Sequence, residues 1–175
     1  MNEIITDAVI LLNQPQNDID KSIVLLTKEL GVIRAKAISG SKMTSKLSPH
    51  LNPLNLVKVR LINKNSFIVA DALTENNFKN IREDESKLKN ALESLFLIQF
   101  LTPQETPDDN LWNEVVDGLK LESINKSNIL TVLGYSPELS TCFECNSKET
   151  EHFLYEDQIF ACNNCYNKIA SRIKN

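Results

Sequence analysis

Short runs of alternating apolar and polar residues fill the first part of the chain, and this period of two predicts β-strands. In one run, Val57, Val59 and Leu61 are apolar. Lys58 and Arg60 lie between them, so one face of the expected strand is apolar and the other is basic. The expected strands cover residues 4–12, 22–26, 32–39, 56–62 and 67–73. Five strands in so short a segment predict a small closed β-barrel of the OB type, whose strand face binds oligonucleotides.

From Ile81 the apolar spacing becomes helical. The acidic residues Glu83 to Glu85 lie where a helix begins, because the positive end of the helix dipole favours acids. The apolar positions of the expected helix are Leu88, Ala91, Leu92, Leu95, Phe96, Ile98 and Leu101. So broad an apolar surface predicts a helix at the centre of its domain, ending before Pro103.

Three shorter helices are expected after it. Thr106 offers a capping hydroxyl, and Pro107 suits the first helical position. Ser123 is the expected cap of the next helix, and Gly134 its stop. Residues 167–174 are expected to close the chain as a short helix.

All four cysteines of the chain lie in two Cys-x-x-Cys pairs, Cys142 with Cys145 and Cys162 with Cys165. Two residues between paired cysteines let both sulfurs turn toward one ion, and two such pairs make a tetrahedral site for structural Zn²⁺. Four thiolates leave no open position for a substrate. The expected role of the ion is therefore to fold a segment too short to bury its own core.

Other uses of the cysteines fit less well. Two disulfides would suit a secreted chain, and a redox Cys-x-x-Cys needs no second copy at this spacing. His152 lies between the pairs and could replace a ligand, but the four thiolates already fill a zinc site.

The strands, helices and cysteine pairs together predict the α+β fold class. We expect an OB-type barrel domain at residues 1–78, then an α-helical domain at 79–175 with a Cys₄ zinc-finger segment at 140–167.

Composition narrows the class of protein. A hydrophobic content of 42% supports a real core, and no apolar run is long enough to span a bilayer. The first residues lack the basic and apolar regions of a signal peptide. We therefore expect a cytoplasmic protein with no membrane partner, associated with the nucleoid if it binds DNA.

The net charge of −4 hides an asymmetry, because residues 1–64 carry a net charge of +4 and residues 65–175 a net charge of −8. Residues 31–64 contain seven Lys or Arg and no acid. Such a segment is either an ordinary solvated surface or a nucleic-acid-binding face. The candidate phosphate contacts are Arg34, Lys36, Lys42, Lys46, Lys58 and Arg60. Contacts of this kind give binding that tolerates any sequence and weakens with salt.

Aromatic stacking is expected to add little to this binding. The barrel offers only Phe67, which suits the core, and Phe78. His50 fits an ordinary loop histidine. Trp112, the one tryptophan, is expected in the helical core, with a partner-binding hot spot as the alternative.

Four passages together are similar to one known family. They are Thr-Lys-Glu-Leu-Gly-Val-Ile-Arg-Ala-Lys-Ala at 27–37, Ile-Arg-Glu-Asp at 81–84, Leu-Thr-Pro-Gln-Glu at 101–105, and Leu-Gly-Tyr-Ser-Pro-Glu-Leu-Ser-Thr-Cys-Phe-Glu-Cys at 133–145. With a small barrel followed by helices, the chain resembles the RecO family of bacterial DNA repair proteins.

The resemblance implies a recombination mediator and no small-molecule chemistry. Family members bind single- and double-stranded DNA, anneal complementary strands and work with RecR. They help to load RecA onto DNA coated by single-stranded-DNA-binding protein (SSB), and some carry a Cys₄ zinc site.

The chain departs from the family pattern in three ways. It ends ten residues after Cys165, where the family usually continues, which puts any partner site built there in doubt. Asn146 replaces a common glycine, and the whole chain is acidic for a DNA-binding protein.

Two other classes of function remain open. One is a zinc-containing scaffold that binds only proteins. The other is an enzyme such as a nuclease, for which the sequence contains no carboxylate cluster with metal spacing and no nucleophile–base pair. We expect a protein that is not an enzyme.

Overall fold

The structure is a computed structural model that describes residues 2–38, 40 and 45–173, with no side chains described from 170 onward. The chain forms two compact units, Met1–Ile129 and Leu130–Asn175. The domain boundary expected between residues 78 and 79 lies inside the first unit, and it stays a prediction.

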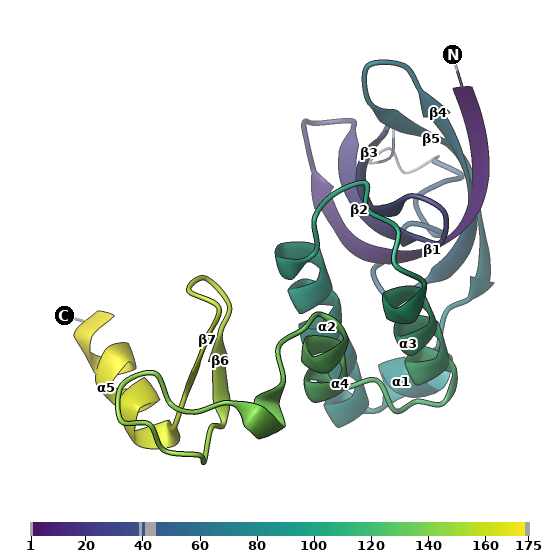
Figure 1. The fold of residues 1–175 in the computed structure, drawn as a ribbon. Helices are drawn as coiled ribbons and strands as arrows, with labels where there is room; N and C mark the ends of the chain where they lie inside the picture. The colour runs from purple at the N-terminus through teal and green to yellow at the C-terminus, as the bar shows by residue number, and fades with distance from the viewer. Residues whose placement is uncertain (1, 39, 41–44, 174–175) are drawn as a thin grey trace. The chain divides into compact units, whose positions relative to one another are not determined.

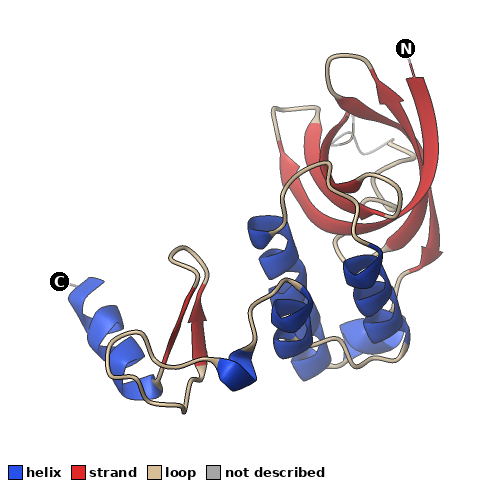
Figure 2. Cartoon of the chain, in the orientation of Figure 1, coloured by secondary structure: helices blue, strands red, loops and turns tan. Residues whose placement is uncertain are grey.

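The first unit begins with a closed five-stranded barrel (Figures 1 and 2). Its strands are β1 (Asn2–Pro15), β2 (Lys21–Thr27), β3 (Gly31–Ala37), β4 (Leu56–Asn63) and β5 (Phe67–Asn76). Their order around the barrel is β1-β2-β3-β5-β4, with β3 and β5 parallel and the other neighbours antiparallel. The five-stranded OB-type barrel expected from the sequence is confirmed.

The alternation along the strands sorts the side chains between the inside and the outside of the barrel. On β4, Val57, Val59 and Leu61 are fully buried, while Lys58 is exposed. The buried side chains packed together inside the barrel include Ala8, Ile10, Ile23, Leu25, Ile33, Ala35, Val57, Val59, Leu61, Phe67 and Val69. This continuous apolar interior is the main source of the barrel's stability.

The connection between β3 and β4 is fastened to the barrel where it is described. Leu51 and Leu54 are fully buried. The backbone N–H of Leu54 donates to the carbonyl of Ile10 at 2.9 Å, and the N–H of Ile10 donates to the carbonyl of Asn55 at 3.0 Å. The Asn13 amide also donates to the Leu51 carbonyl at 2.8 Å. Residues 51–55 are therefore held in one conformation against β1.

Helices follow the barrel: α1 (Lys79–Glu83), α2 (Glu85–Leu101), α3 (Asp109–Lys120) and α4 (Lys126–Val132). The expected acidic helix start is confirmed at α2, where the Asp84 carboxylate accepts from the N–H of Lys87 at 3.0 Å. In this helix Ala91, Leu95 and Ile98 are buried, as expected of a central helix. Trp112 of α3 is also buried, which confirms its expected place in the helical core.

The structure corrects two expected helix caps. The cap of α3 is Asp108 rather than Thr106, because the Asp108 carboxylate accepts from two N–H groups of the first turn, at 2.9 and 3.0 Å. The cap of α4 is Asn125 rather than Ser123, since its side-chain oxygen accepts from the N–H of Asn128 at 3.0 Å. In both cases the side chain adjoining the helix takes the role.

The segment between α2 and α3 returns to the barrel and crosses the start of β3 (Figure 1). The N–H of Glu105 donates to the carbonyl of Val32 at 2.9 Å. At Gly31 the backbone has φ +70°, and a Cβ there would lie 2.2 Å from the carbonyl oxygen of Thr106. Gly31 thus lets the two backbones meet and allows the helices to pack beside the barrel.

The second unit is small and contains little regular structure. It holds the short 3₁₀ helix η1 (Pro137–Leu139), the hairpin of β6 (His152–Leu154) and β7 (Ile159–Ala161), and the helix α5 (Asn163–Ile173). The expected last helix is confirmed but begins four residues earlier than predicted. Among the described helices, none has the length and apolar character needed to cross a bilayer.

Candidate metal centre and nucleic-acid interface

The four cysteines of the second unit form one cluster. The Sγ atoms of Cys142, Cys145, Cys162 and Cys165 all lie within 4.8 Å of one another, and all four thiols are free. Cys145 and Cys162 have their Sγ atoms 3.6 Å apart. Metal–sulfur bonds of about 2.3 Å in a tetrahedron place the sulfurs about 3.8 Å apart. The donor set therefore fits a single tetrahedral metal ion.

A tight turn shapes the first cysteine pair. The N–H of Asn146 donates to the carbonyl of Cys142 at 2.9 Å, and the N–H of Cys142 donates to the carbonyl of Ser147 at 2.8 Å. Asn146 has φ 56°, a left-handed conformation that asparagine tolerates better than most residues. Asparagine at position 146 is thus compatible with the turn.

The second pair lies where β7 gives way to α5. Cys162 follows the last residue of β7, and Cys165 lies in the first turn of α5. The N–H of Tyr166 donates to the carbonyl of Cys162 at 3.0 Å. The N–H of Phe143 donates to the carbonyl of Phe160 at 3.0 Å, which joins the first pair to the same strand. Backbone hydrogen bonds thus bring both pairs together.

Hydrogen bonds and burial give the thiols different acidities. Backbone hydrogen bonds from Cys162 and Cys145 lower the pKa of Cys142 to about 6. Burial, together with the neighbouring thiols, raises the pKa of Cys165. A backbone hydrogen bond from Ser147 lowers the pKa of Cys145, but the neighbouring thiols and burial outweigh it, and the net shift is upward. In the metal-free protein at neutral pH, Cys142 is therefore largely a thiolate, whereas Cys145 and Cys165 are protonated.

Metal uptake should consequently release protons. We expect Zn²⁺ added to the metal-free protein at pH 7 to displace at least the protons of Cys145 and Cys165, because only thiolates bind the ion. Apparent Zn²⁺ affinity should rise with pH, since fewer protons must then be displaced. Titration in a weakly buffered solution with a pH indicator measures the release. A pH-independent affinity with no proton release would contradict a thiolate site.

His152 is not a member of the cysteine cluster. Its Nε2 lies 3.3 Å from Oδ1 of Asn163, and its ring stacks on that of Tyr166 with the ring centroids 3.9 Å apart. Within the described residues of this unit, the group that can hold an ion consists of the four cysteines alone. This arrangement agrees with the expectation that the four thiolates fill the site without His152.

The candidate phosphate contacts of the barrel fall on two separate faces. We call the outer side of β2 and β3 around Arg34 and Lys36 the β3 face. Arg34 is exposed and donates to Oγ of Ser22 at 3.2 Å, and Lys36 lies 2.9 Å from a carboxylate oxygen of Asp20. Lys21 is paired with Ala37, whose side chain is buried inside the barrel, so Lys21 does not share the outer side of the sheet with Arg34 and Lys36.

Two further candidates belong to the connection after β3. Lys46 is exposed, and the structure gives it no ion pair with any described residue. Lys42 lies outside the described residues. The sequence interpretation missed the ion pair between Lys36 and Asp20, because the two residues belong to segments that are separated in the sequence.

Lys58 and Arg60 lie on a second face, formed by the outer sides of β1, β4 and β5, which we call the β4 face. Lys58 lies 3.2 Å from Asp7 and 3.6 Å from Glu75, and Arg60 lies 3.6 Å from Glu3. A hydrogen bond and the charge of Asp7, with a contribution from Glu75, raise the pKa of Lys58. In the barrel order, β5 lies between β4 and β3. Both cations are thus occupied by carboxylates, and their role as phosphate contacts stays a prediction.

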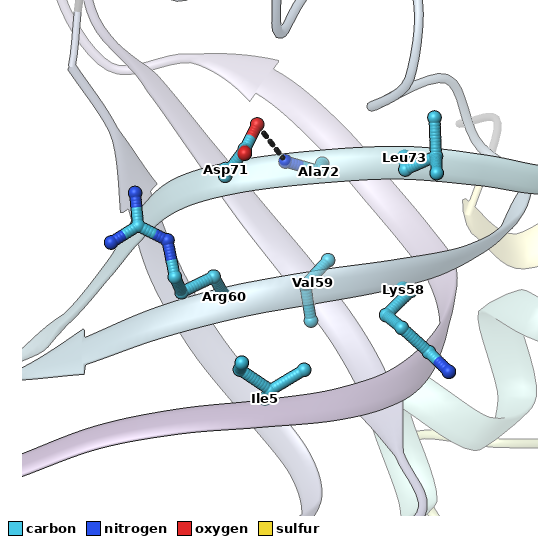
Figure 3. Close-up of a pocket in the computed structure, with 7 residues that line it drawn as sticks. All are labelled: Ile5, Lys58, Val59, Arg60, Asp71, Ala72 and Leu73. Carbon is cyan, nitrogen blue, oxygen red and sulfur yellow. Dashed lines mark hydrogen bonds between the residues drawn. The ribbon is translucent and has the colours of Figure 1, made fainter.

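A shallow groove of about 200 Å³ runs along the β4 face (Figure 3). Ile5 and Leu73 lie beside it and are 63% and 64% exposed. In the view of Figure 3, Lys58 and Arg60 point away from each other on either side of Ile5, and Asp71 lies on the neighbouring strand. The β4 face therefore combines exposed apolar side chains with both signs of charge.

The other residues of the barrel considered as DNA contacts are buried or hydrogen-bonded within the fold. Phe67 and Phe78 are buried, so neither ring is placed to stack on a base. Nδ1 of His50 lies 2.8 Å from the hydroxyl of Thr74 and accepts from its N–H at 3.1 Å, as befits a loop histidine. DNA binding by this barrel would consequently depend on charge.

Comparisons with known proteins agree with this architecture. The family model "Recombination protein O N terminal" matches residues 1–68. A DNA repair protein RecO of Dehalococcoides mccartyi is 30% identical over 93% of this chain and 70% of its own length. The chain belongs to the RecO family. The RecO proteins of Thermodesulfovibrio yellowstonii and Bacillus subtilis are 29% and 28% identical, over 91% and 95% of this chain and 69% and 70% of their own lengths.

Membership of the RecO family indicates a role in DNA repair and recombination. It confirms the resemblance found in four passages of the sequence. The family's N-terminal match ends within β5, so it covers both the β3 face and β4. The comparisons thus link a DNA repair role to a chain whose barrel carries these two faces.

Proposed function

We propose that this RecO-family protein is a recombination mediator that binds single- and double-stranded DNA through its β3 face. The observation that carries the proposal is the charge of that face and the connection after it. Arg34, Lys36 and Lys46 lie there with Asp20 as the paired carboxylate. Several cations that outnumber nearby acids suit a polyanionic ligand.

The mechanism proposed needs no bond to be made or broken. Neutralising the phosphates of one strand lets a complementary strand approach, and holding strands on one protein raises their local concentration. In this role the protein anneals strands and, with RecR, helps RecA to load onto SSB-coated DNA. It would act in the cytoplasm, at the nucleoid, and not as an enzyme.

We further propose that the four cysteines hold a structural Zn²⁺. The donor set supports this, because four thiolates around one ion leave no coordination position for a substrate. The ion would supply no chemistry and would hold the second unit in shape. This proposal is independent of where DNA binds.

The DNA-binding proposal is tested by fluorescence anisotropy with a labelled single-stranded oligonucleotide, across a salt titration, on metal-loaded protein. We expect binding at low salt, with log affinity falling by about 0.7 per phosphate contact for each decade of salt. Absence of binding at low salt would overturn the proposal.

A second function is favoured by the β4 face, where exposed Ile5 and Leu73 flank paired charges. Such a surface suits a protein partner better than a polyanion, so a zinc-containing interaction scaffold is the alternative. A gel shift at low and moderate salt separates the two, because a scaffold without DNA binding retards no DNA at either.

A further inference from the structure

A pocket of about 400 Å³ lies in the first unit, beside the connection that enters β4, the end of β5 and α1. The polar side chains that line it are His50, Asn52, Asn55, Thr74, Asn77 and Arg82. Five of these are neutral, one is a cation, and no carboxylate lines the pocket. The composition of the lining therefore points to an anionic ligand.

Arg82 is the cation, and only neutral groups hold it. Its Nε donates to the carbonyl of Asn77 at 2.6 Å. One of its terminal nitrogens donates to the carbonyl of Pro53 at 2.7 Å and to Oδ1 of Asn55 at 2.9 Å. No carboxylate in the described part of the chain forms a salt bridge with Arg82, in contrast to Lys36, which has Asp20 at 2.9 Å. The guanidinium is thus fixed in position without a counter-charge.

Such an arrangement has an energetic cost that an anion would offset. Partial burial lowers the pKa of Arg82, because the charge is less well solvated than in water. Neutral carbonyls satisfy some of its N–H groups but leave the net charge in place. An oxyanion in the pocket would supply both the charge and further acceptors for the guanidinium.

His50 adds a donor to the lining. Because the N–H of Thr74 donates to Nδ1 of His50 at 3.1 Å, that nitrogen is an acceptor. The neutral ring must therefore carry its proton on Nε2, which is a hydrogen-bond donor. The pocket thus combines a fixed cation with a ring N–H and with the amides of Asn52 and Asn77.

The backbone beside the pocket is held in an unfavourable conformation. Leu54, next to Asn55, has φ 79°, and Phe78, next to Asn77, has φ 50°. Both side chains are buried, which holds these left-handed conformations in place. Bulky residues seldom adopt them, at a cost of about 1–3 kcal/mol each, and such residues cluster at ligand sites.

We infer that this pocket binds a phosphate group. Planar guanidinium pairs with phosphate oxygens through charge-assisted hydrogen bonds, and Arg82 is presented for this without a competing carboxylate. The phosphate could belong to a DNA backbone, in which case the inference rests on the proposed function, or to a free phosphate. The chemistry at the pocket is the same for both.

The test is a titration of the full chain with inorganic phosphate, followed by ¹H–¹⁵N NMR at constant ionic strength. In the wild-type protein we expect saturable shifts of the signals of Arg82 Nε–H, Asn77 and the backbone of His50. Asn77→Asp adds a carboxylate to the lining of the pocket without changing side-chain size, and it keeps the hydrogen bond from Arg82 because that bond goes to the backbone carbonyl of residue 77. It should weaken phosphate binding about tenfold or more, because the added charge repels the anion at close range.

Asn113→Asp is the matched control, since Asn113 is exposed on α3 and the substitution changes net charge equally. It should bind phosphate like the wild type. The inference is overturned if phosphate causes no saturable shifts at the pocket, if chloride causes the same shifts, or if Asn77→Asp and wild type bind phosphate equally.

A second titration with a single-stranded oligonucleotide identifies the source of the phosphate. If the pocket takes a backbone phosphate, DNA shifts the same signals and Asn77→Asp weakens DNA binding. If it takes free phosphate, DNA leaves these signals unchanged while inorganic phosphate still moves them. If the protein binds no DNA, the proposed function fails, but the titration with inorganic phosphate still tests the pocket. The two failures are therefore distinguishable.

Discussion

Replacing Cys142 and Cys145 by serine should abolish metal binding and unfold the second unit while the first unit stays folded. The reason is the composition of the second unit's core. Among the described residues of this unit, the cluster of buried core residues consists of Cys142, Cys162 and Cys165. The aromatic contacts beside it, Phe153 with Tyr135 and with Phe160, leave these rings partly exposed. Structural Zn²⁺ contributes on the order of 10 kcal/mol to folding in small domains, which such a core cannot replace.

Metal content and limited proteolysis measure this result together. The double variant should bind no zinc and be cleaved within residues 130–175, while a fragment containing the barrel survives. Glu144→Ser is the matched control, because it changes an exposed residue of the same turn and keeps all four ligands. A double variant that lost the metal but resisted protease like the wild type would show that the second unit folds without it.

The barrel was predictable because its strands carry their own pattern. On β4 the apolar residues Val57, Val59 and Leu61 follow a period of two, and the structure buries each of them. The cysteine cluster was predictable for a similar reason, since the two-residue spacing within a pair lets both sulfurs face one ion. In both cases the information lies within a few neighbouring residues.

Helix beginnings were harder to place because several capping residues compete within one turn. Thr106, Asp108 and Asp109 precede or begin the same helix, and each can cap by composition alone. The structure selects Asp108, whose carboxylate reaches two N–H groups at once. A small difference in hydrogen bonding therefore determines which residue caps the helix, and this difference cannot be read from the local sequence.

The surroundings of the basic residues could not be predicted, because their partners come from distant segments. The carboxylates of Asp7 and Glu75, which bind Lys58, belong to strands on either side of it in the barrel. The residues that line the pocket at Arg82 likewise come from the connection before β4, the end of β5 and α1. Only the closed strand order brings these segments together.

Neutralising Arg34 and Lys36 together should reduce single-stranded-DNA affinity about twenty-five-fold at about 0.1 M salt if each makes one phosphate contact. The slope of log affinity against log salt should become shallower by about 1.4, because two counterion-releasing contacts are lost. Arg34→Gln/Lys36→Gln is the variant of choice. Gln keeps a polar side chain beside Ser22 and Asp20, whereas Glu would repel Asp20 and disturb the barrel. Fluorescence anisotropy across a salt titration measures both quantities.

Lys58→Gln/Arg60→Gln is the matched comparison, because it also removes two cations from the outer side of one strand. We expect a smaller loss of DNA affinity from it, since the acids Asp7, Glu75 and Glu3 already hold these two cations. An equal or greater loss would move the DNA to the β4 face, and phosphates would then have to displace those carboxylates. Unchanged affinity in both variants would mean that neither face binds DNA. The choice between the faces thus depends on charge left over after ion pairing, not on the number of lysines and arginines.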